Sequence, residues 1–224
     1  MELVCRHGFR YSHPFSRKEV PMKTFACWSL AIAVLFISAA EARQTINGCQ
    51  IKRRANCPGA DLSGANLTRS NLANADLAGA NLSGADLSGD RITEANLTGA
   101  NLSNANLSEA DLSETYMNNA DLSHANLAKA DLSQSILLGA NLSGANLAGA
   151  NFSMAILKGA DLTGADARGA VFAMASLVDA KLSRVDFTGA KLIGADMRNT
   201  NLQGARFCNT TMPDRSINNS GCLK

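Results

Sequence analysis

The sequence predicts an all-β fold in which the chain winds into a regular coil around an apolar interior. Three observations predict it: a five-residue period, an apolar residue at the centre of every unit, and a small residue two positions earlier. The period runs through residues 60–214 as 31 units without an insertion or deletion. A helix needs apolar residues to recur about every 3.6 positions and a strand every 2, so a sustained period of five fits neither.

Each unit repeats the same chemistry around its central residue i. All 31 central residues are apolar and 22 are Leu; position i−2 is Ala in 24 units, i−1 is Asp or Asn in 21, and i+2 is Gly in 14. In a locally extended chain, i−2 and i point inward together, while i−1 and i+1 point outward. A turn at i+2, which suits Gly or a small polar residue, returns the next Ala and Leu to the interior. Successive coils can then pair like parallel strands, about 4.8 Å apart.

Units such as Ala60-Asp61-Leu62-Ser63-Gly64 and Ala100-Asn101-Leu102-Ser103-Asn104 resemble the pentapeptide-repeat family, whose motif is A(D/N)LXX. The resemblance implies a right-handed quadrilateral parallel β-helix with four units per coil, so that 31 units make about eight coils. Its stability should come from stacking between neighbouring coils, and the open edges at both ends must be covered. The C-terminal segment 207–222 is similar to terminal segments of exported bacterial members.

Residues 22–42 have the pattern of a secretory signal peptide. One lysine precedes an apolar run at 25–37, and Ala40-Glu41-Ala42 supplies the small-x-small cleavage pattern. We therefore expect cleavage after residue 42 and a mature protein in the periplasm or outside the cell, with no stable membrane anchor. An uncleaved anchor is the alternative, although the apolar run is short for a membrane span.

Export changes how the cysteines are interpreted, because oxidising compartments favour disulfide bonds. Four of the six cysteines remain after cleavage, and they allow three connectivities. We expect Cys49–Cys57 and Cys208–Cys222, because the repeats between the two pairs should hold the ends of the chain far apart. Each bridge closes a short loop and should add about 2–3 kcal/mol. The predicted organisation is a mis-assigned extension at 1–21, a signal peptide at 22–42, an N-terminal cap at 43–59, the β-helix at 60–214 and a C-terminal cap at 215–224.

Departures from the repeat gather on one side of the predicted coil. Units 20 residues apart should stack, so three consecutive coils place Tyr116, Ile136 and Ile156 outward, where Asp or Asn is usual. Six neighbouring outward positions are also apolar: Leu138, Met154, Val171, Met174, Val178 and Ile193. Exposed apolar patches often mark interaction sites, so we hypothesise that these nine residues, the apolar patch, form a homodimer or protein-partner interface. Drift of the repeat toward β-branched residues is the alternative.

The charge balance bears on the class of partner. Residues 43–224 hold 16 basic and 16 acidic side chains, which does not favour a nucleic-acid binder. The balance hides a net charge of −7 over 61–131 and of +3 over 132–224. Some members of the family resemble DNA in shape and charge and bind type II topoisomerases, which supplies the alternative function. That role needs a long acidic surface in the cytoplasm, so we expect an exported structural or protein-interaction solenoid instead.

We predict no enzymatic activity, cofactor or metal site. The carboxylates of the repeat should lie on a flat side of the coil rather than in a cleft, and cleavage leaves one histidine, His124, for acid–base chemistry. Two interior positions are unusual. Asp90 occupies an inward i−2 position and needs a partner, either Arg91 or the turn backbone. Ala167 is undersized for a central position, and we expect neighbouring phenylalanines to fill the space.

Overall fold

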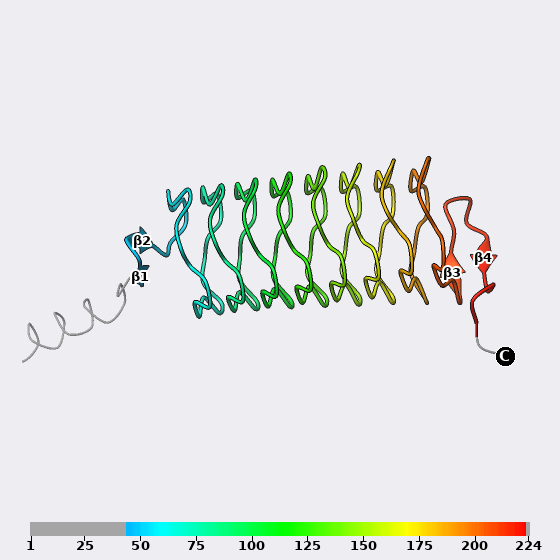
Figure 1. The fold of residues 1–224 in the computed structure, drawn as a ribbon, viewed down its shortest axis with the longest axis horizontal. Helices are drawn as coiled ribbons and strands as arrows, with labels where there is room; N and C mark the ends of the chain where they lie inside the picture. The colour runs from blue at the N-terminus through cyan, green and yellow to red at the C-terminus, as the bar shows by residue number, and fades with distance from the viewer. Residues whose placement is uncertain (1–43, 223–224) are drawn as a thin grey trace, which may run out of the picture. The chain divides into compact units, whose positions relative to one another are not determined.

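The computed structural model describes residues 44–222, which form a right-handed quadrilateral parallel β-helix. Twenty-eight parallel bridges, from Asn56↔Asp76 to Lys191↔Thr211, each join residues 20 positions apart. Four units therefore make one coil, which confirms the predicted fold class, and Figure 1 shows these coils stacked one after another. The predicted extension at 1–21 and signal peptide at 22–42 lie outside the described residues.

Backbone hydrogen bonds hold each unit to the next coil and close its own turn. Leu62 N donates to Asn81 O at 2.7 Å, Gly64 N donates to Ser83 O at 2.9 Å, and Ala65 N returns to Leu62 O at 3.1 Å. The same pattern recurs along the described coils. Because the neighbouring coils supply most of these partners, an isolated coil would leave its backbone groups unpaired.

The turns tolerate more residue types than the sequence pattern suggested. Every i+2 residue from 54 to 209 has a positive φ, yet fewer than half of these residues are Gly. Glu114 and Met154 adopt φ values of 58° and 60°. A non-glycine side chain costs about 1–2 kcal/mol in this left-handed conformation. The stacked backbone on both sides imposes the turn despite that cost.

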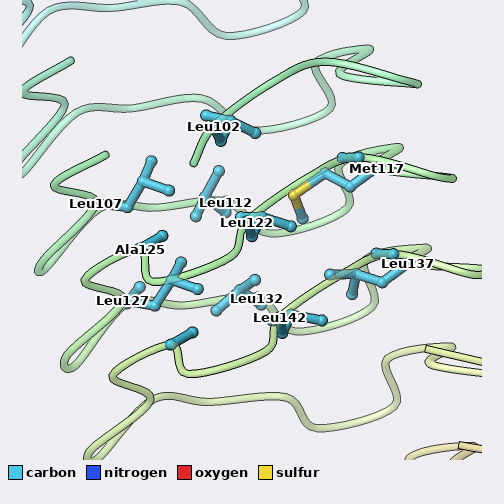
Figure 2. Packing of buried hydrophobic residues seen from close by; sticks show 14 of the residues in the cluster. Leu102, Leu107, Leu112, Met117, Leu122, Ala125, Leu127, Leu132, Leu137 and Leu142 are labelled. Carbon is cyan, nitrogen blue, oxygen red and sulfur yellow. The ribbon is translucent and has the colours of Figure 1, made fainter. Parts of the chain in front are cut away.

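The interior is a set of stacked apolar columns. Central residues from 62 to 192 are at most 1% exposed. Figure 2 shows the central leucines of successive coils lying over one another, including Leu102, Leu122 and Leu142. Each fully buried leucine side chain contributes about 1.5–3 kcal/mol through the hydrophobic effect. The core is therefore continuous along the whole stack.

Four phenylalanines continue the core toward the C-terminal end. The Phe152 and Phe172 rings stack with centroids 4.9 Å apart, and the Phe187 and Phe207 rings stack at 5.5 Å. Phe172 also meets Phe187 edge to face at 5.9 Å. Ala167, one coil before Phe187, is fully buried. The unit of Phe187 lies directly over that of Ala167, because Ala167 N donates to Asp186 O at 2.9 Å.

The N-terminal end of the helix is covered by a short hairpin. Strand β1 (Thr45–Ile46) pairs antiparallel with β2 (Cys49–Gln50), and a disulfide joins Cys49 to Cys57. The parallel ladder begins at residue 56, inside the segment predicted as the cap. The coil therefore begins a few residues before the repeat motif becomes recognisable in the sequence.

Side chains in and next to this hairpin supply the hydrogen bonds that a preceding coil would otherwise donate to the first coil. Inside the stack, the carbonyl of Asn81 accepts the N–H of Leu62, 19 residues earlier. At the first coil, the Asn47 side-chain amide donates to Asp61 O at 2.8 Å, and the Gln44 amide donates to Asn66 O at 3.2 Å. The open edge of the first coil is thus capped by side-chain donors, which protects it from pairing with other chains.

The C-terminal end is covered by a second hairpin. Strand β3 (Thr210–Thr211) pairs antiparallel with β4 (Ile217–Asn218), and a disulfide joins Cys208 to Cys222. The parallel ladder ends at residue 211, before the predicted boundary at 214. The reason is that the chain turns back into β4, and the positive φ expected at 214 moves to Arg215.

Candidate interaction surface

Most of the outer surface is an ordered ladder of Asp and Asn side chains. On the side centred on residues 122, 142 and 162, called the ladder side, Asn141 Oδ1 accepts the N–H of Ser143 at 3.1 Å. The Asn141 amide also donates to Asp121 Oδ1, one coil earlier, at 3.0 Å. The i−1 residue therefore satisfies a backbone N–H in its own unit and connects two coils, which explains the preference for Asp or Asn.

The side centred on residues 117, 137, 157 and 177, called the patch side, lacks this ladder in the middle of its length. Tyr116 pairs with Ile136, and Ile136 pairs with Ile156, in successive parallel bridges. Tyr116 is 48% exposed, Ile156 is 39% exposed, and Ile136 is half-buried. None of the three side chains can accept the i+1 N–H as Asp or Asn does. These units therefore lack the side-chain hydrogen bond to their i+1 N–H and expose apolar surface in its place.

The other predicted patch residues differ in exposure. Leu138, Met154 and Met174 are exposed, whereas Val171, Val178 and Ile193 are partly buried. Met174 lies close over Gly194, whose missing side chain leaves room for the Met174 sulfur. The structure therefore places the nine residues on the patch side, at the corner before it and, for Val171 and Ile193, on the preceding side. Five of the nine are exposed: Tyr116, Leu138, Met154, Ile156 and Met174.

Charged side chains of both signs lie around and within the apolar patch. Exposed Glu94 and Glu114 lie at the N-terminal end, where a shallow cavity of about 250 Å³ is lined by Glu94, Glu114, Tyr116, Gln134 and Ile136. Exposed Lys158 lies in the middle of the patch, in the same unit as Ile156, and exposed Lys191 lies toward the C-terminal end, on the preceding side. Within residues 44–222, neither the two glutamates nor the two lysines form an ion pair.

Arg198, near the C-terminal end of the patch, already forms an ion pair with Asp196. Its guanidinium donates to the Asp196 carboxylate at 2.6 Å, and this hydrogen bond holds the pKa of Asp196 below its usual value. Sequence reasoning missed Lys158 and Lys191 as part of this surface. The 20-residue stacking could have identified them, because Lys158 lies one coil after Leu138 and Lys191 one coil after Val171.

Asp90 is the one carboxylate of the repeat that points into the interior, and it is 1% exposed. The Ser70 hydroxyl donates to Asp90 Oδ2 at 2.9 Å, and the Ser70 backbone N–H donates to Oδ1. Burial raises the pKa of Asp90 to about 6, although both Ser70 hydrogen bonds oppose the shift. Of the two partners predicted for Asp90, the structure thus uses a turn backbone, one coil earlier, rather than Arg91.

Among residues 44–222, no group of three or more His, Cys, Asp and Glu side chains is placed to hold a metal ion. In that same part of the chain, no helix is long and apolar enough to cross a membrane. On the patch side, the arrangement offers an outward apolar stack with charged side chains around and within it.

Comparison with known proteins finds a match to the family model of pentapeptide repeats, in eight copies over residues 53–89, 91–127, 125–164, 155–192 and 175–212. No protein with a curated description matches the chain. The family match spans most of the β-helix.

Several solved structures are similar to this chain. HetL, a pentapeptide repeat protein involved in heterocyst differentiation regulation in the cyanobacterium Nostoc sp. strain PCC 7120, is 28% identical over 83% of this chain and 98% of its own, with a TM-score of 0.32. A pentapeptide repeat protein from the thylakoid lumen of Arabidopsis thaliana is 39% identical over 42% and 61% of the two chains, with a TM-score of 0.25. Full-length QnrB1, a plasmid-mediated fluoroquinolone resistance protein, is 20% identical over 67% and 90%, with a TM-score of 0.35.

Proposed function

The chain belongs to the pentapeptide-repeat family, and from this premise we propose that it is an exported, non-enzymatic protein whose rigid β-helix presents the apolar patch to a protein partner. The observation that carries the proposal is the outward stack of Tyr116, Ile136 and Ile156 on three consecutive coils. Each replaces a residue type that would have capped its own unit. A hydrogen bond of this kind is worth about 1 kcal/mol, so the stack is a local cost to stability.

Drift of the repeat toward strand-forming residues does not account for the whole patch. Met154 and Met174 occupy left-handed turn positions, with φ values of 60° and 57°. Strand preference has no bearing on such positions, and a long side chain is strained there. Both side chains are nevertheless more than half exposed. Flexible, polarisable methionine side chains are typical of adaptable binding surfaces, which supports an interface.

Two features support export. The chain carries a signal-peptide pattern at 22–42, and disulfides join Cys49 to Cys57 and Cys208 to Cys222 at the two ends of the β-helix. Disulfides persist in oxidising compartments and are rare in the reducing cytosol. Location in the periplasm or outside the cell follows from this proposal. The alternative, a nucleic-acid mimic, is less well supported because the second half of the chain carries net positive charge.

A binding experiment after cell fractionation tests the proposal. The full chain, expressed with residues 1–42 present, should appear in the exported fraction with a new N-terminus at residue 43. Protein recovered from that fraction should bind a partner, and Ile136→Asp combined with Ile156→Asp should weaken binding at least about tenfold, because two charges would be buried in an apolar contact.

The matched control places two charges on the ladder side instead. Ser103 and Ser143 occupy outward positions there, so Ser103→Asp combined with Ser143→Asp should leave binding unchanged. Equal loss in both double variants would show that added charge alone is responsible. Cytoplasmic retention of the uncleaved chain would contradict the export part of the proposal.

A further inference from the structure

The C-terminal cap continues the hydrogen bonding of the stack on two of the four sides. On those sides, Met212 N donates to Ser216 O at 2.8 Å, and Asn209 N donates to Asn219 Oδ1 at 2.7 Å. Both acceptors take the place of a following coil. The patch side and the ladder side end instead at residues 195–204, called the open edge, where the last parallel bridges of these two sides lie.

The open edge presents backbone groups that are paired elsewhere in the stack. From residue 57 to residue 194, every central N–H and every i+2 N–H donates to the following coil, and the i−2 carbonyls accept from it. At the open edge, the four corresponding N–H groups and two carbonyl groups have no hydrogen-bond partner among residues 44–222. The donors belong to Met197, Asn199, Leu202 and Gly204, and the carbonyls belong to Ala195 and Thr200.

The apolar interior is also uncovered at this edge. Leu202 is 38% exposed, whereas Leu182, one coil earlier, is fully buried. Met197 is partly buried and packs against the core. An extended strand is the structure that supplies alternating backbone donors and acceptors together with an apolar side chain at this spacing.

We propose that the open edge binds an extended segment of another protein, which adds a parallel strand across the patch side and the ladder side. This surface lies at the end of the stack and is separate from the apolar patch. Within the stack, each i−1 residue donates its N–H to the i−2 carbonyl of the coil before and accepts the central N–H of that coil. The bound segment therefore carries two apolar residues five positions apart, one over Met197 and one over Leu202.

Side chains near the open edge define the segment further. Asparagines of the ladder side donate to the Asp or Asn of the coil before, so an Asn preceding each apolar residue would donate to Asp196 and Asn201. The Arg184 side chain lies close to Gly204 and forms no ion pair within residues 44–222. An acidic residue two positions after the second apolar residue would lie over Gly204, beside this guanidinium.

A peptide with the sequence of residues 100–109, acetylated and amidated at its ends, has all of these features and serves as the probe. It is titrated into the full chain labelled with ¹⁵N, and the amide signals are followed by NMR. The signals of Met197, Asn199, Leu202 and Gly204 should shift, with a Kd of about 0.1–1 mM, because a short flexible segment loses entropy when it is ordered. The same four amides should exchange more slowly with solvent.

Two matched peptides test whether the backbone ladder is used. Methylation of the backbone nitrogens of Asn101 and Asn106 removes the N–H groups that should donate to Ala195 and Thr200, so binding should weaken at least about tenfold. Methylation at Leu102 and Leu107 instead should preserve binding, because a central N–H points away from the preceding coil. The protein is unchanged in both measurements, so its folding does not affect the comparison.

A charge reversal tests the position of the acidic residue. Arg184→Glu should weaken binding of the probe about two- to fivefold, the range of an exposed ion pair. A probe that ends in Lys instead of Glu should recover the lost affinity for this variant. Met154→Asp changes the apolar patch and should leave binding of the probe unchanged, which separates the two surfaces.

Three outcomes would overturn the inference. The first is an absence of shifts at the four amides with the probe at about 5 mM. The second is an equal loss of affinity for the two methylated peptides. The third is a dimer that buries these amides and is not displaced by the probe, which would assign the open edge to a second copy of the chain. None of these outcomes bears on the proposed function, which depends on the binding of the Ile136→Asp/Ile156→Asp variant.

Discussion

The ladder side and the patch side share one backbone and one interior but differ in what they show to solvent. Leucines 122, 142 and 162 line the interior of the first, and leucines 137, 157 and 177 line the interior of the second, all fully buried. Outside, one side carries a hydrogen-bonded series of Asp and Asn, and the other carries Tyr116, Ile136 and Ile156. Because bonds between coils and the stacked core hold each unit, the outward i−1 residue can change without changing the coil.

The largest effect is expected from substitutions in the apolar interior that the two sides share. Leu122→Ala on the ladder side and Leu137→Ala on the patch side should each lower the free energy of unfolding by about 2–5 kcal/mol, because both leave a cavity in the same close-packed interior. Urea denaturation followed by circular dichroism measures the loss. A much smaller loss on the patch side would contradict the view that the two interiors are equivalent.

The next effect comes from Asp90, the position where a polar side chain enters the shared interior. Its pKa is raised by burial to about 6, above the ordinary value of 3.8, so the folded state binds the proton more tightly than the unfolded state does. The stabilising contribution of the protonated form is complete below about pH 4 and is lost as the pH rises through about 6. A shift of roughly two pKa units corresponds to about 3 kcal/mol.

Asp90→Asn provides the reference for that measurement, because Asn is neutral at every pH and its side-chain oxygen can still accept from Ser70. Between about pH 4 and pH 7, wild type should lose about 3 kcal/mol of unfolding free energy relative to the variant. Denaturation curves of both proteins at the two pH values give the difference. A constant difference would show that the buried carboxylate does not titrate in this range.

The smallest effect sharpens the contrast between the outer surfaces. Asn141→Ala on the ladder side removes the hydrogen bonds to Ser143 N and Asp121, and should cost about 1 kcal/mol. Ile156→Asn on the patch side introduces the missing side-chain acceptor and should stabilise the unit by up to about 1 kcal/mol while weakening partner binding. Thermal unfolding and binding are measured together. A loss of stability at 156 would indicate that the apolar stack itself stabilises the fold.

The fold could be predicted because its determinants are local and repeated. Alternation over two residues decides which side chains point inward, and a turn every five residues decides the period, so both are visible in any single unit such as 60–64. The 20-residue coil, implied by the family resemblance, is confirmed by the bridges from Asn56↔Asp76 onward. The same register allowed Tyr116, Ile136 and Ile156 to be placed in one column before their exposure was known.

The remaining features depend on contacts between coils and on the length of side chains. Asp90 accepts from Ser70, one coil earlier, because the stacked turn offers a backbone N–H and a hydroxyl together, and no local pattern selects that partner over Arg91. Within the patch, Met154 is exposed whereas Val171 is partly buried, because the long Met154 side chain at a corner extends into solvent.

The sequence by itself determined the coil, its apolar interior and the column of outward apolar residues, because each follows from geometry within five residues repeated without interruption. Only the tertiary structure decided the left-handed turn at residues such as Glu114, the capping of Asp61 O by Asn47, and the unpaired charges around the patch. Those depend on what the adjacent coil or cap supplies, and stacking forces outweigh the preference of the individual residue.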